Sequence, residues 1–311
     1  SGQHRREAGM KPRRVLVTGA GGFVGNALAL GFARLDWEVI GLDRSFDAAW
    51  EDDGIRQVTA ELADGVPSDL PGVDLVVHAA WTTTDAETLG VTAAAYVALN
   101  VRPLLAVLEY SARTRPAAFV FLSSSGVFGL SDGDEGLTDA HQPTGTSPYA
   151  VAKRAAELLV PVALEKDTAG HVMRLGYLFG PGEAARPSRL RVSQAAGWVS
   201  SAREGHPLAV RADDPRRDWT FIADLAAALE RTVDGPAAAG PVHLGSPHVL
   251  SDSAFATLIA SQLSVPNPVR ASATGKVKPP MVPSDIPALR DFAWTSPDDG
   301  LRVLLAREVR A

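Results

Sequence analysis

Short apolar runs alternate with helical patterns through the first half of the chain. The runs that we interpret as strands cover residues 15–18, 39–42, 75–78, 118–123 and 171–175. Residues 26–35, 96–113 and 149–166 show the spacing that is typical of helices. The apolar runs are continuous rather than alternating, which indicates strands buried on both faces. The pattern therefore predicts an α/β fold, with a doubly wound parallel sheet between two layers of helices.

The pattern weakens after Gly180, where Arg, Pro and Ser become frequent. From there we predict a helix over 193–203, a strand and helix over 218–229, a strand at 242–244, loops over 265–287 and a helix over 297–308. We expect a cofactor-binding domain of residues 11–180 plus about 217–246, a smaller C-terminal α/β substrate domain of 181–216 and 247–311, and a disordered tail of 1–10. The cleft between the two domains is the natural substrate site.

Composition narrows the function classes. The 311 residues are 46% hydrophobic, so a sizeable core is expected. The net charge is −6 with no basic block beyond the N-terminal stretch, which argues against nucleic acid as a partner. The absence of cysteine excludes disulfides and thiolate metal sites. No apolar run approaches about 18 residues, and the first nine residues lack the apolar segment of a signal peptide. We therefore predict a cytoplasmic protein with no membrane span.

A glycine-rich segment follows the first predicted strand and precedes the first helix. It reads Gly19-Ala20-Gly21-Gly22-Phe23-Val24-Gly25. Gly19, Gly22 and Gly25 have the spacing G-x-x-G-x-x-G, whereas the commoner G-x-G-x-x-G fails at Val24. Glycines here allow a tight turn and close approach of backbone to a pyrophosphate, which the helix N-terminus attracts. The segment predicts a dinucleotide site; the alternative is a tight turn without a ligand.

An acidic residue ends the second predicted strand. Asp43 lies 18 residues beyond Gly25, where a carboxylate is expected to meet the adenosine ribose. A carboxylate accepts both ribose hydroxyls and repels a 2′-phosphate, so it favours NAD over NADP. The neighbouring Arg44 could hold a 2′-phosphate, which leaves NADP as the less favoured cofactor.

Tyr149 and Lys153 lie four residues apart and therefore share one face of a predicted helix. An ammonium near the phenol lowers the pKa of the tyrosine, and the phenol can then exchange a proton near neutral pH while hydride moves. About 25 residues earlier, Ser123, Ser124 and Ser125 end a strand, and ligands bind at that end of parallel strands. The alternatives are an exposed helix pair and a serine turn.

Together these residues closely resemble the extended short-chain dehydrogenase/reductase family, the NAD-dependent epimerases and dehydratases of nucleotide sugars. The resemblance runs from about Arg14 to the C-terminus. Residues 18–25 match its T-G-x-x-G-x-x-G turn, His78-Ala79-Ala80 its H-x-A-A-like strand end, and residues 127–129 its V-Y-G segment. The segments at 174–181 and 217–224 resemble R-x-x-N-x-x-G-P and R-D-F-x-x-V-x-D. The resemblance implies a Rossmann-type fold.

The resemblance also implies roles for individual residues. Ser124, Tyr149 and Lys153 would be catalytic, with Asn100 supporting the site. NAD would be bound by Gly19, Gly21, Gly22, Phe23, Val24, Gly25, Asp43, Arg44, Glu61, Leu62, His78, Ala79, Ala80, Ser123, Tyr149 and Lys153. A homodimer with the helices near 96–113 and 149–166 packed across a two-fold axis is implied as well.

Substrate contacts are expected from Thr82, Thr83, Ser124, Ser125, Tyr177, Arg186 and Arg217. Arg189 and Arg191 are further candidates, with a solvated loop as the alternative. Tyr177 replaces the asparagine of the family pattern, which puts a nucleotide diphosphate in doubt, although Arg217 takes the place of a phosphate-binding arginine. Ser125 and Gly126 replace the Asp-Glu pair of the dehydratases, so 4,6-dehydration is not expected. His78 has no accompanying ligand cluster, so we interpret it as structural and predict no metal.

We therefore predict an NAD-dependent sugar or nucleotide-sugar epimerase or oxidoreductase. A first alternative is a dehydrogenase or ketoreductase for a non-nucleotide sugar, a sugar acid or a natural-product ketone. A second, of another class, is a non-catalytic NAD-sensing regulatory protein, since a fold does not determine a function.

Overall fold

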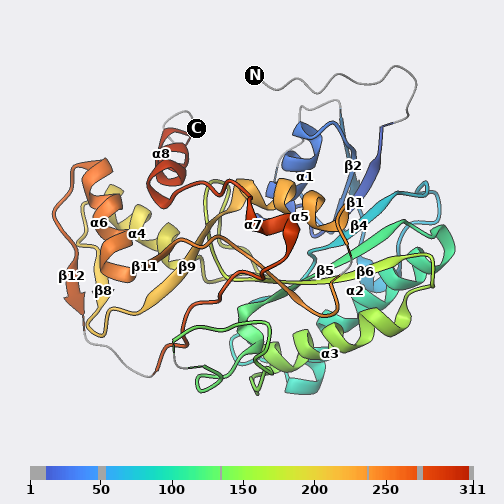
Figure 1. Ribbon diagram of the computed structural model, residues 1–311, viewed down its shortest axis with the longest axis horizontal. Coiled ribbons are helices and arrows are strands. Elements are labelled where there is room, and N and C mark those ends of the chain that lie inside the picture. The colour runs from blue at the N-terminus through green and yellow to red at the C-terminus, as the bar shows by residue number, and fades with distance from the viewer. Residues whose placement is uncertain (1–11, 48–53, 134, 237, 272–275, 308–311) are drawn as a thin grey trace.

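A parallel sheet of seven strands forms the centre of the larger lobe (Figure 1). The computed structural model describes residues 12–47, 54–133, 135–236, 238–271 and 276–307, so the predicted tail lies outside it. The strand order is β10-β6-β5-β4-β1-β2-β3. The strands are β1 (Arg14–Thr18), β2 (Glu38–Asp43), β3 (Ile55–Thr59), β4 (Leu75–His78), β5 (Ala118–Ser124), β6 (Ala169–Leu175) and β10 (Val242–Leu244). The chain reverses its winding direction between β1 and β4, where ligands of such sheets bind.

Helices cover both faces of this sheet. One face carries α1 (Phe23–Arg34) and α5 (Leu225–Val233), whose Phe32 and Leu229 join one buried apolar cluster. The other carries α2 (Ala93–Thr114) and α3 (Pro148–Ala163), whose apolar sides join a second cluster. Burial on both faces explains why the strands are apolar throughout. The predicted doubly wound α/β fold is confirmed.

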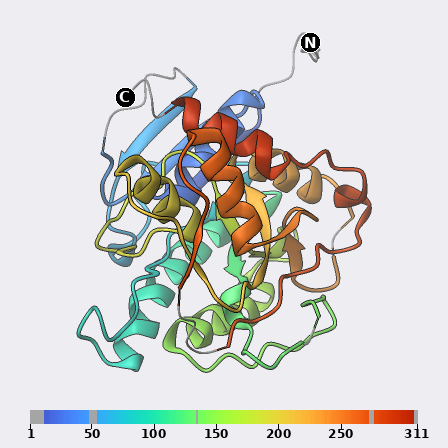
Figure 2. The same cartoon turned by 90° about the vertical axis from the view of Figure 1, so that its left-hand side faces the viewer.

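The smaller lobe has its own aromatic core. Its strands form a sheet β11-β9-β7 and a pair β12-β8. The elements are β7 (Tyr177–Phe179), β8 (Ala209–Arg211), β9 (Arg216–Phe221), β11 (Val249–Ser251), β12 (Val269–Ala271), α4 (Gln194–Arg203), α6 (Asp252–Leu263) and α8 (Pro297–Arg307). Figure 2 views the molecule from this side, with the orange α6 and red α8 in front. The rings of Trp219 and Phe255 stack with centroids 3.9 Å apart, and Trp198 packs beside them.

The sequence predicted the elements of the large lobe more completely than those of the small one. Each predicted strand of the large lobe is present within two residues of its predicted bounds, but β3 was not predicted. The helix α6 and the short strands β7, β8, β11 and β12 were also missed. β9 falls in the segment that the sequence assigned to the cofactor domain, yet it pairs with β7 and β11.

Short helical segments complete the fold. They are the single turns η1 (Leu62–Asp64), η2 (Ser125–Val127) and η3 (Ile222–Asp224), and the helix α7 (Pro287–Arg290) beside α5. Across the described residues, we find no helix with the length and hydropathy that a bilayer crossing requires.

Candidate active site

The glycine turn connects β1 to α1 in a conformation that only glycine fits well. Gly19 has φ +72°, and a Cβ there would lie 2.6 Å from backbone of Ala80. A Cβ on Gly25 would overlap the carbonyl oxygen of Gly19, and one on Gly21 would overlap that of Ser45. No side chain caps the N-terminus of α1. The free amides and positive dipole end of this helix can therefore receive a phosphate group.

Asp43 stands at the end of β2 beside this turn. Its Oδ2 accepts a hydrogen bond from the amide of Gly21 at 3.0 Å. Asp43 and Arg44 line a cavity of about 660 Å³ together with Glu61, Leu62 and Ala80. These predicted cofactor residues are thus brought together around one space, which is large enough for a nucleoside.

A second cavity, of about 340 Å³, contains Ser123, Ser124, Tyr149 and Lys153. The two cavities share five lining residues at the centre of one groove: Gly19, Gly22, Ala79, Trp81 and Ser188. The indole nitrogen of Trp81 is buried there without a hydrogen-bond partner. A groove with the glycine turn at its centre and a nucleoside-sized cavity at one end fits a dinucleotide. We call the cavity lined by Asp43 the nucleoside cavity and the one that contains Tyr149 the catalytic cavity. The catalytic candidates then lie at the nicotinamide end.

Helix α3 presents its functional side chains on one face. Ser147 caps its N-terminus and Pro148 begins it, which fixes Tyr149 in the first turn. Lys153 is buried, and its Nζ donates to the carbonyl oxygen of Leu122 at 2.6 Å and lies 3.9 Å from the centre of the Trp81 ring. Burial lowers the pKa of Lys153 well below its usual value, while the carboxylate of Glu157, one turn further along, raises it.

The pKa of Tyr149 is shifted in the direction opposite to the prediction. We expected Lys153 to lower it, but burial of the phenol raises the pKa of Tyr149. A hydrogen bond with Ser124 and the positive charge of Arg189 act in the opposite direction. Desolvation is the larger effect because the phenol is buried.

A buried ion pair supports the catalytic strand from behind. Arg174 on β6 donates to both carboxylate oxygens of Glu157, at 2.9 and 2.7 Å. Ser123 donates to the same carboxylate at 2.6 Å. Ser123 therefore links the end of β5 to α3, and its hydroxyl is committed to that contact.

His78 is held as a structural residue would be. Its Nδ1 is 2.8 Å from the hydroxyl of Thr18, and burial, with a smaller contribution from Lys153, lowers the pKa of His78 to about 3. The ring is therefore neutral at physiological pH. Among the residues that the structure describes, we find no group of three acidic or histidine side chains suited to a metal.

Asn100 lines the nucleoside cavity and not the cavity that contains Tyr149. Its Oδ1 accepts a hydrogen bond from the amide of Thr82 at 2.7 Å, and its Nδ2 donates to the carbonyl of Tyr96. The Tyr96 hydroxyl donates to the carbonyl of Thr82 at 2.6 Å. Asn100 therefore holds the loop after β4, which carries Trp81 and the threonines.

Residues 186–190 form a strap that is joined to the loop after β4. The amides of Thr83 and Thr84 donate to the carbonyl oxygen of Ser188 at 2.8 and 3.1 Å. The Thr84 hydroxyl donates to the carbonyl of Pro187 and accepts from the amide of Leu190, both at 3.0 Å. Arg186 pairs with Asp47 across the groove. The strap thus has anchors on both sides of the cofactor groove.

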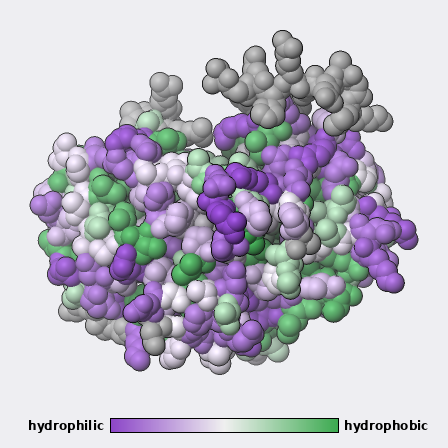
Figure 3. All heavy atoms as spheres, in the orientation of Figure 1, coloured by the Kyte–Doolittle hydropathy of each residue, from purple (hydrophilic) through white to green (hydrophobic). Residues whose placement is uncertain are grey.

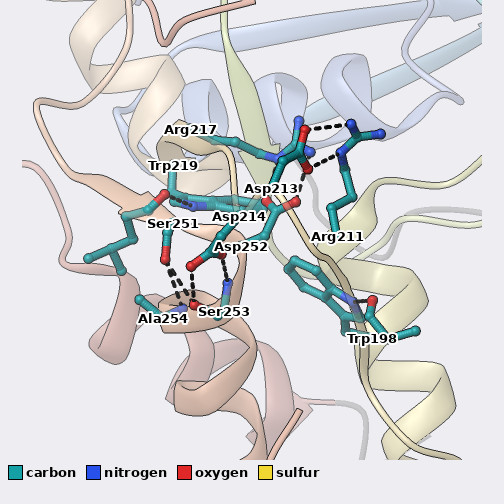
Figure 4. A network of polar contacts seen from close by, with 12 residues as sticks. Trp198, Arg211, Asp213, Asp214, Arg217, Trp219, Ser251, Asp252, Ser253 and Ala254 are labelled. Carbon is teal, nitrogen blue, oxygen red and sulfur yellow. Dashed lines mark hydrogen bonds and ion pairs between the residues drawn. The ribbon is translucent and has the colours of Figure 1, made fainter. Parts of the chain in front are cut away.

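Some of the predicted substrate residues line one of the two cavities, and others line neither. Thr83, Ser124, Tyr177 and Arg186 line the catalytic cavity, and Thr82 lines the nucleoside cavity. Arg217 and Ser125 line neither cavity. Arg217 is paired with Asp252, as Figure 4 shows, and the carbonyl oxygen of Ser125 accepts a hydrogen bond from Lys278.

Sequence reasoning missed Trp81, Lys278 and Asp252. Trp81 directly follows the predicted strand end at 78–80, so its place in the chain could have revealed it. Lys278 and Asp252 carry no local signal because they reach the site only through the fold of the small lobe.

The model of the NAD dependent epimerase/dehydratase family matches residues 15–244, which include the glycine turn, the serines and the Tyr149–Lys153 pair. The chain belongs to this family. The resemblance predicted from the motifs is therefore confirmed, and NAD is the cofactor of the family. The finding leaves open which reaction is catalysed.

Characterised relatives within the family differ in chemistry. The chain is 28% identical over 245 residues to a 2-alkyl-3-oxoalkanoate reductase of Stenotrophomonas maltophilia, covering 74% of this chain and 69% of the relative. It is 26% identical over 250 residues to a dTDP-glucose 4,6-dehydratase of Streptomyces niveus, covering 75% and 72%. The fold resembles that of a UDP-N-acetylglucosamine 4-epimerase of Methanobrevibacter ruminantium, with TM-score 0.79, 18% identity and coverage of 96% and 100%.

Proposed function

We propose that this protein is an NAD-dependent enzyme that interconverts a secondary alcohol and a ketone on a sugar-like substrate, as an epimerase or an oxidoreductase. One observation carries the proposal: Tyr149 and Ser124 line the same cavity as Gly19, Gly22 and Gly25 of the glycine turn. A proton-transfer group and a dinucleotide groove in contact are what such a reaction needs.

Ser124, Tyr149 and Lys153 have different roles in the proposed reaction. The Ser124 Oγ accepts a hydrogen bond from the amide of Gly126 at 3.0 Å. Its proton, which is directed at Tyr149 here, would be donated to a substrate oxygen when substrate binds. Tyr149 takes the alcohol proton or returns it to the carbonyl oxygen. Lys153 would hold the nicotinamide ribose and stabilise the phenolate. NAD, when bound, supplies the acceptor and donor of hydride.

Replacing Tyr149 by Phe tests this mechanism. We expect the turnover number to fall by roughly 10²- to 10⁴-fold, because the proton-transfer group is lost. NAD affinity, measured by calorimetry, should stay within about twofold, since the ring is retained. Turnover of an established substrate by Y149F at the wild-type rate would refute the assignment. That outcome would assign the proton transfer to a group other than Tyr149.

The comparisons support more than one reaction. The 2-alkyl-3-oxoalkanoate reductase favours a ketoreductase as the second candidate function. Because one relative is a 4,6-dehydratase, 4,6-dehydration stays among the candidate reactions, even though Ser125 and Gly126 carry no carboxylate. Absorbance at 340 nm separates the possibilities. Net gain or loss of NADH with one substrate indicates a dehydrogenase or reductase, whereas product formed without a lasting change at 340 nm indicates an epimerase or dehydratase.

We propose NAD rather than NADP as the preferred form. The Asp43 carboxylate lines the nucleoside cavity and its position is fixed by the Gly21 amide, and it would repel a 2′-phosphate. Asp43→Asn should narrow the preference for NAD by about tenfold, measured as the ratio of the two dissociation constants. An unchanged ratio would show that Asp43 does not set the preference for NAD.

A homodimer and a cytoplasmic location stay part of the proposal. Leu158 and Val162 on α3 are 77% and 79% exposed. Figure 3 shows hydrophobic residues gathered at the lower right, the side on which α3 lies in Figure 1. Packing of α2 and α3 against a second copy would cover this area. A monomeric mass in light scattering would contradict the dimer.

A further inference from the structure

The wall of the catalytic cavity away from the glycine turn is aromatic. Tyr177 on β7 and Trp219 on β9 both line it, and their ring centroids are 6.1 Å apart. The chain brings them together because Tyr177 and Trp219 are register partners in the parallel pair β7–β9. Leu175 and Leu178 add aliphatic surface to the same wall. This wall therefore suits an apolar or ring-shaped group.

The cation nearest this wall lies behind it. The guanidinium carbon of Arg217 is 4.5 Å from the centre of the Tyr177 ring, and Arg217 does not line the cavity. Its Nε and one terminal nitrogen donate to the two oxygens of Asp252, at 2.5 and 2.9 Å. The side chains are 9% and 1% exposed. Figure 4 shows this pair between β9 and the start of α6. The positive charge is thus neutralised and covered by Tyr177.

The two arginines of the strap are also matched by carboxylates. Arg189 donates to Oε1 of Glu183 at 3.1 and 2.5 Å. Glu183 is almost fully buried and also accepts from the amide and hydroxyl of Ser193. Arg186 is paired with Asp47 at the rim. Each of the two guanidinium groups therefore has a carboxylate partner.

Lys278 completes the set of cations near this end. Its Nζ donates to the carbonyl oxygen of Ser125. Burial lowers the pKa of Lys278 to about 8, and the carboxylate of Asp218, which is 2% exposed on β9, acts in the opposite direction. Among the described residues around this wall, each of the three arginines, Arg186, Arg189 and Arg217, therefore forms an ion pair with a carboxylate.

A diphosphate brings about two negative charges at neutral pH, and its recognition requires donors with positive charge to spare. Detaching Arg217 from Asp252 would leave a buried carboxylate unpaired, at a cost of about 3–5 kcal/mol. We infer that the catalytic cavity takes a substrate without a phosphate group, an uncharged alcohol or ketone whose remote part packs on Tyr177 and Trp219. The inference rests on the proposed function, since it names the substrate class of that site.

Calorimetry tests this inference by binding alone. The probes are UDP and UDP-glucose, titrated into the protein saturated with NAD so that the nucleoside cavity is occupied. We expect neither probe to bind with a dissociation constant below about 1 mM. Binding of UDP-glucose more tightly than that would overturn the inference. This measurement records binding and not turnover. Its result therefore does not depend on the activity of Y149F, and either proposal can be refuted while the other stands.

A double variant tests the stated cause. Tyr177→Asn with Asp252→Asn removes both the covering ring and the neutralising charge of Arg217. We expect UDP-glucose affinity to rise at least tenfold, to a dissociation constant below about 1 mM. The matched control is Asp299→Asn, which removes a surface carboxylate of α8 and should gain nothing. Thermal melting establishes which variants are folded. A folded double variant that gains no affinity would refute the role of Tyr177 and Asp252. If the double variant does not fold, Tyr177→Asn alone decides, with a gain of at least about threefold expected.

Discussion

The two ends of the groove are built by different means. At the cofactor end, backbone makes the site: Gly19, Gly21 and Gly25 shape a turn that side chains would fill. At the substrate end, side chains from distant segments make it, and their charges are matched in pairs such as Arg217–Asp252. The difference teaches that a backbone-built site depends on a few adjacent residues. A side-chain-built site depends on which partners the fold supplies.

The largest expected effect concerns the cofactor end. Gly25→Ala places a Cβ on the carbonyl oxygen of Gly19, so the turn must distort. Overpacking of this kind costs up to about 3 kcal/mol, and we expect NAD binding to weaken by more than about 100-fold in calorimetry. Gly197→Ala is the matched control, because a Cβ there meets nothing within 4 Å. Wild-type NAD affinity in G25A would show that the turn is not the phosphate site.

A stability measurement probes a buried carboxylate of the substrate end, Asp218. Burial raises the pKa of Asp218 from 3.8 to about 6. Between these pH values the folded protein binds the proton more tightly than the unfolded chain. Its contribution to stability is therefore full below about pH 4 and lost as the pH rises through 6. The loss amounts to about 3 kcal/mol.

Asp218→Asn should remove this part of the pH dependence. The variant should melt at the same temperature as the wild type near pH 4 and at a higher one at pH 7. The measurement is the difference between the two melting curves from pH 4 to 7. A difference that stays constant over this range would mean that Asp218 does not titrate there.

A smaller effect is expected where the two ends meet. Thr84→Val removes two hydrogen bonds between the strap and the loop after β4. At about 1 kcal/mol each, their loss should raise the dissociation rate of NAD by up to roughly 30-fold. Stopped-flow displacement of NADH measures the rate. Thr88→Val, which removes a hydrogen bond to Asp85 in the same loop, is the control. Equal rates in both variants would contradict a role of the strap in cofactor exchange.

The smallest effect is expected at the rim. Arg186 pairs with Asp47, whose side chain is 72% exposed, so solvent screens the interaction. Arg186→Ala should change the NAD dissociation rate by no more than about threefold, as for surface ion pairs. A larger change would assign to Arg186 a direct contact with a ligand.

The sequence predicted the large lobe well for a physical reason. Its strands are buried on both faces, so each is a continuous apolar run that ends where the site begins. The glycine turn, Asp43, Ser124, Tyr149 and Lys153 all lie at such ends or one turn into a helix. Local spacing therefore suffices to bring them to one groove.

The small lobe was predicted poorly because its contacts are not local. Asp252 meets Arg217 across 35 residues, and Lys278 meets Ser125 across 153. Strands of three residues give too short a pattern for periodicity. The predicted direction of the pKa shift of Tyr149 was wrong. The sequence shows a neighbouring charge but not the burial that outweighs it.

The strap has a consequence for the timing of ligand exchange. Ser188 borders both cavities, whereas Tyr177 and Trp219 border only the catalytic one. A dinucleotide long enough to occupy both must pass the strap, while a small product need leave only one cavity. Breaking the Thr83 and Thr84 hydrogen bonds is thus expected to set the residence time of the cofactor. One bound cofactor is then expected to serve many successive substrate molecules.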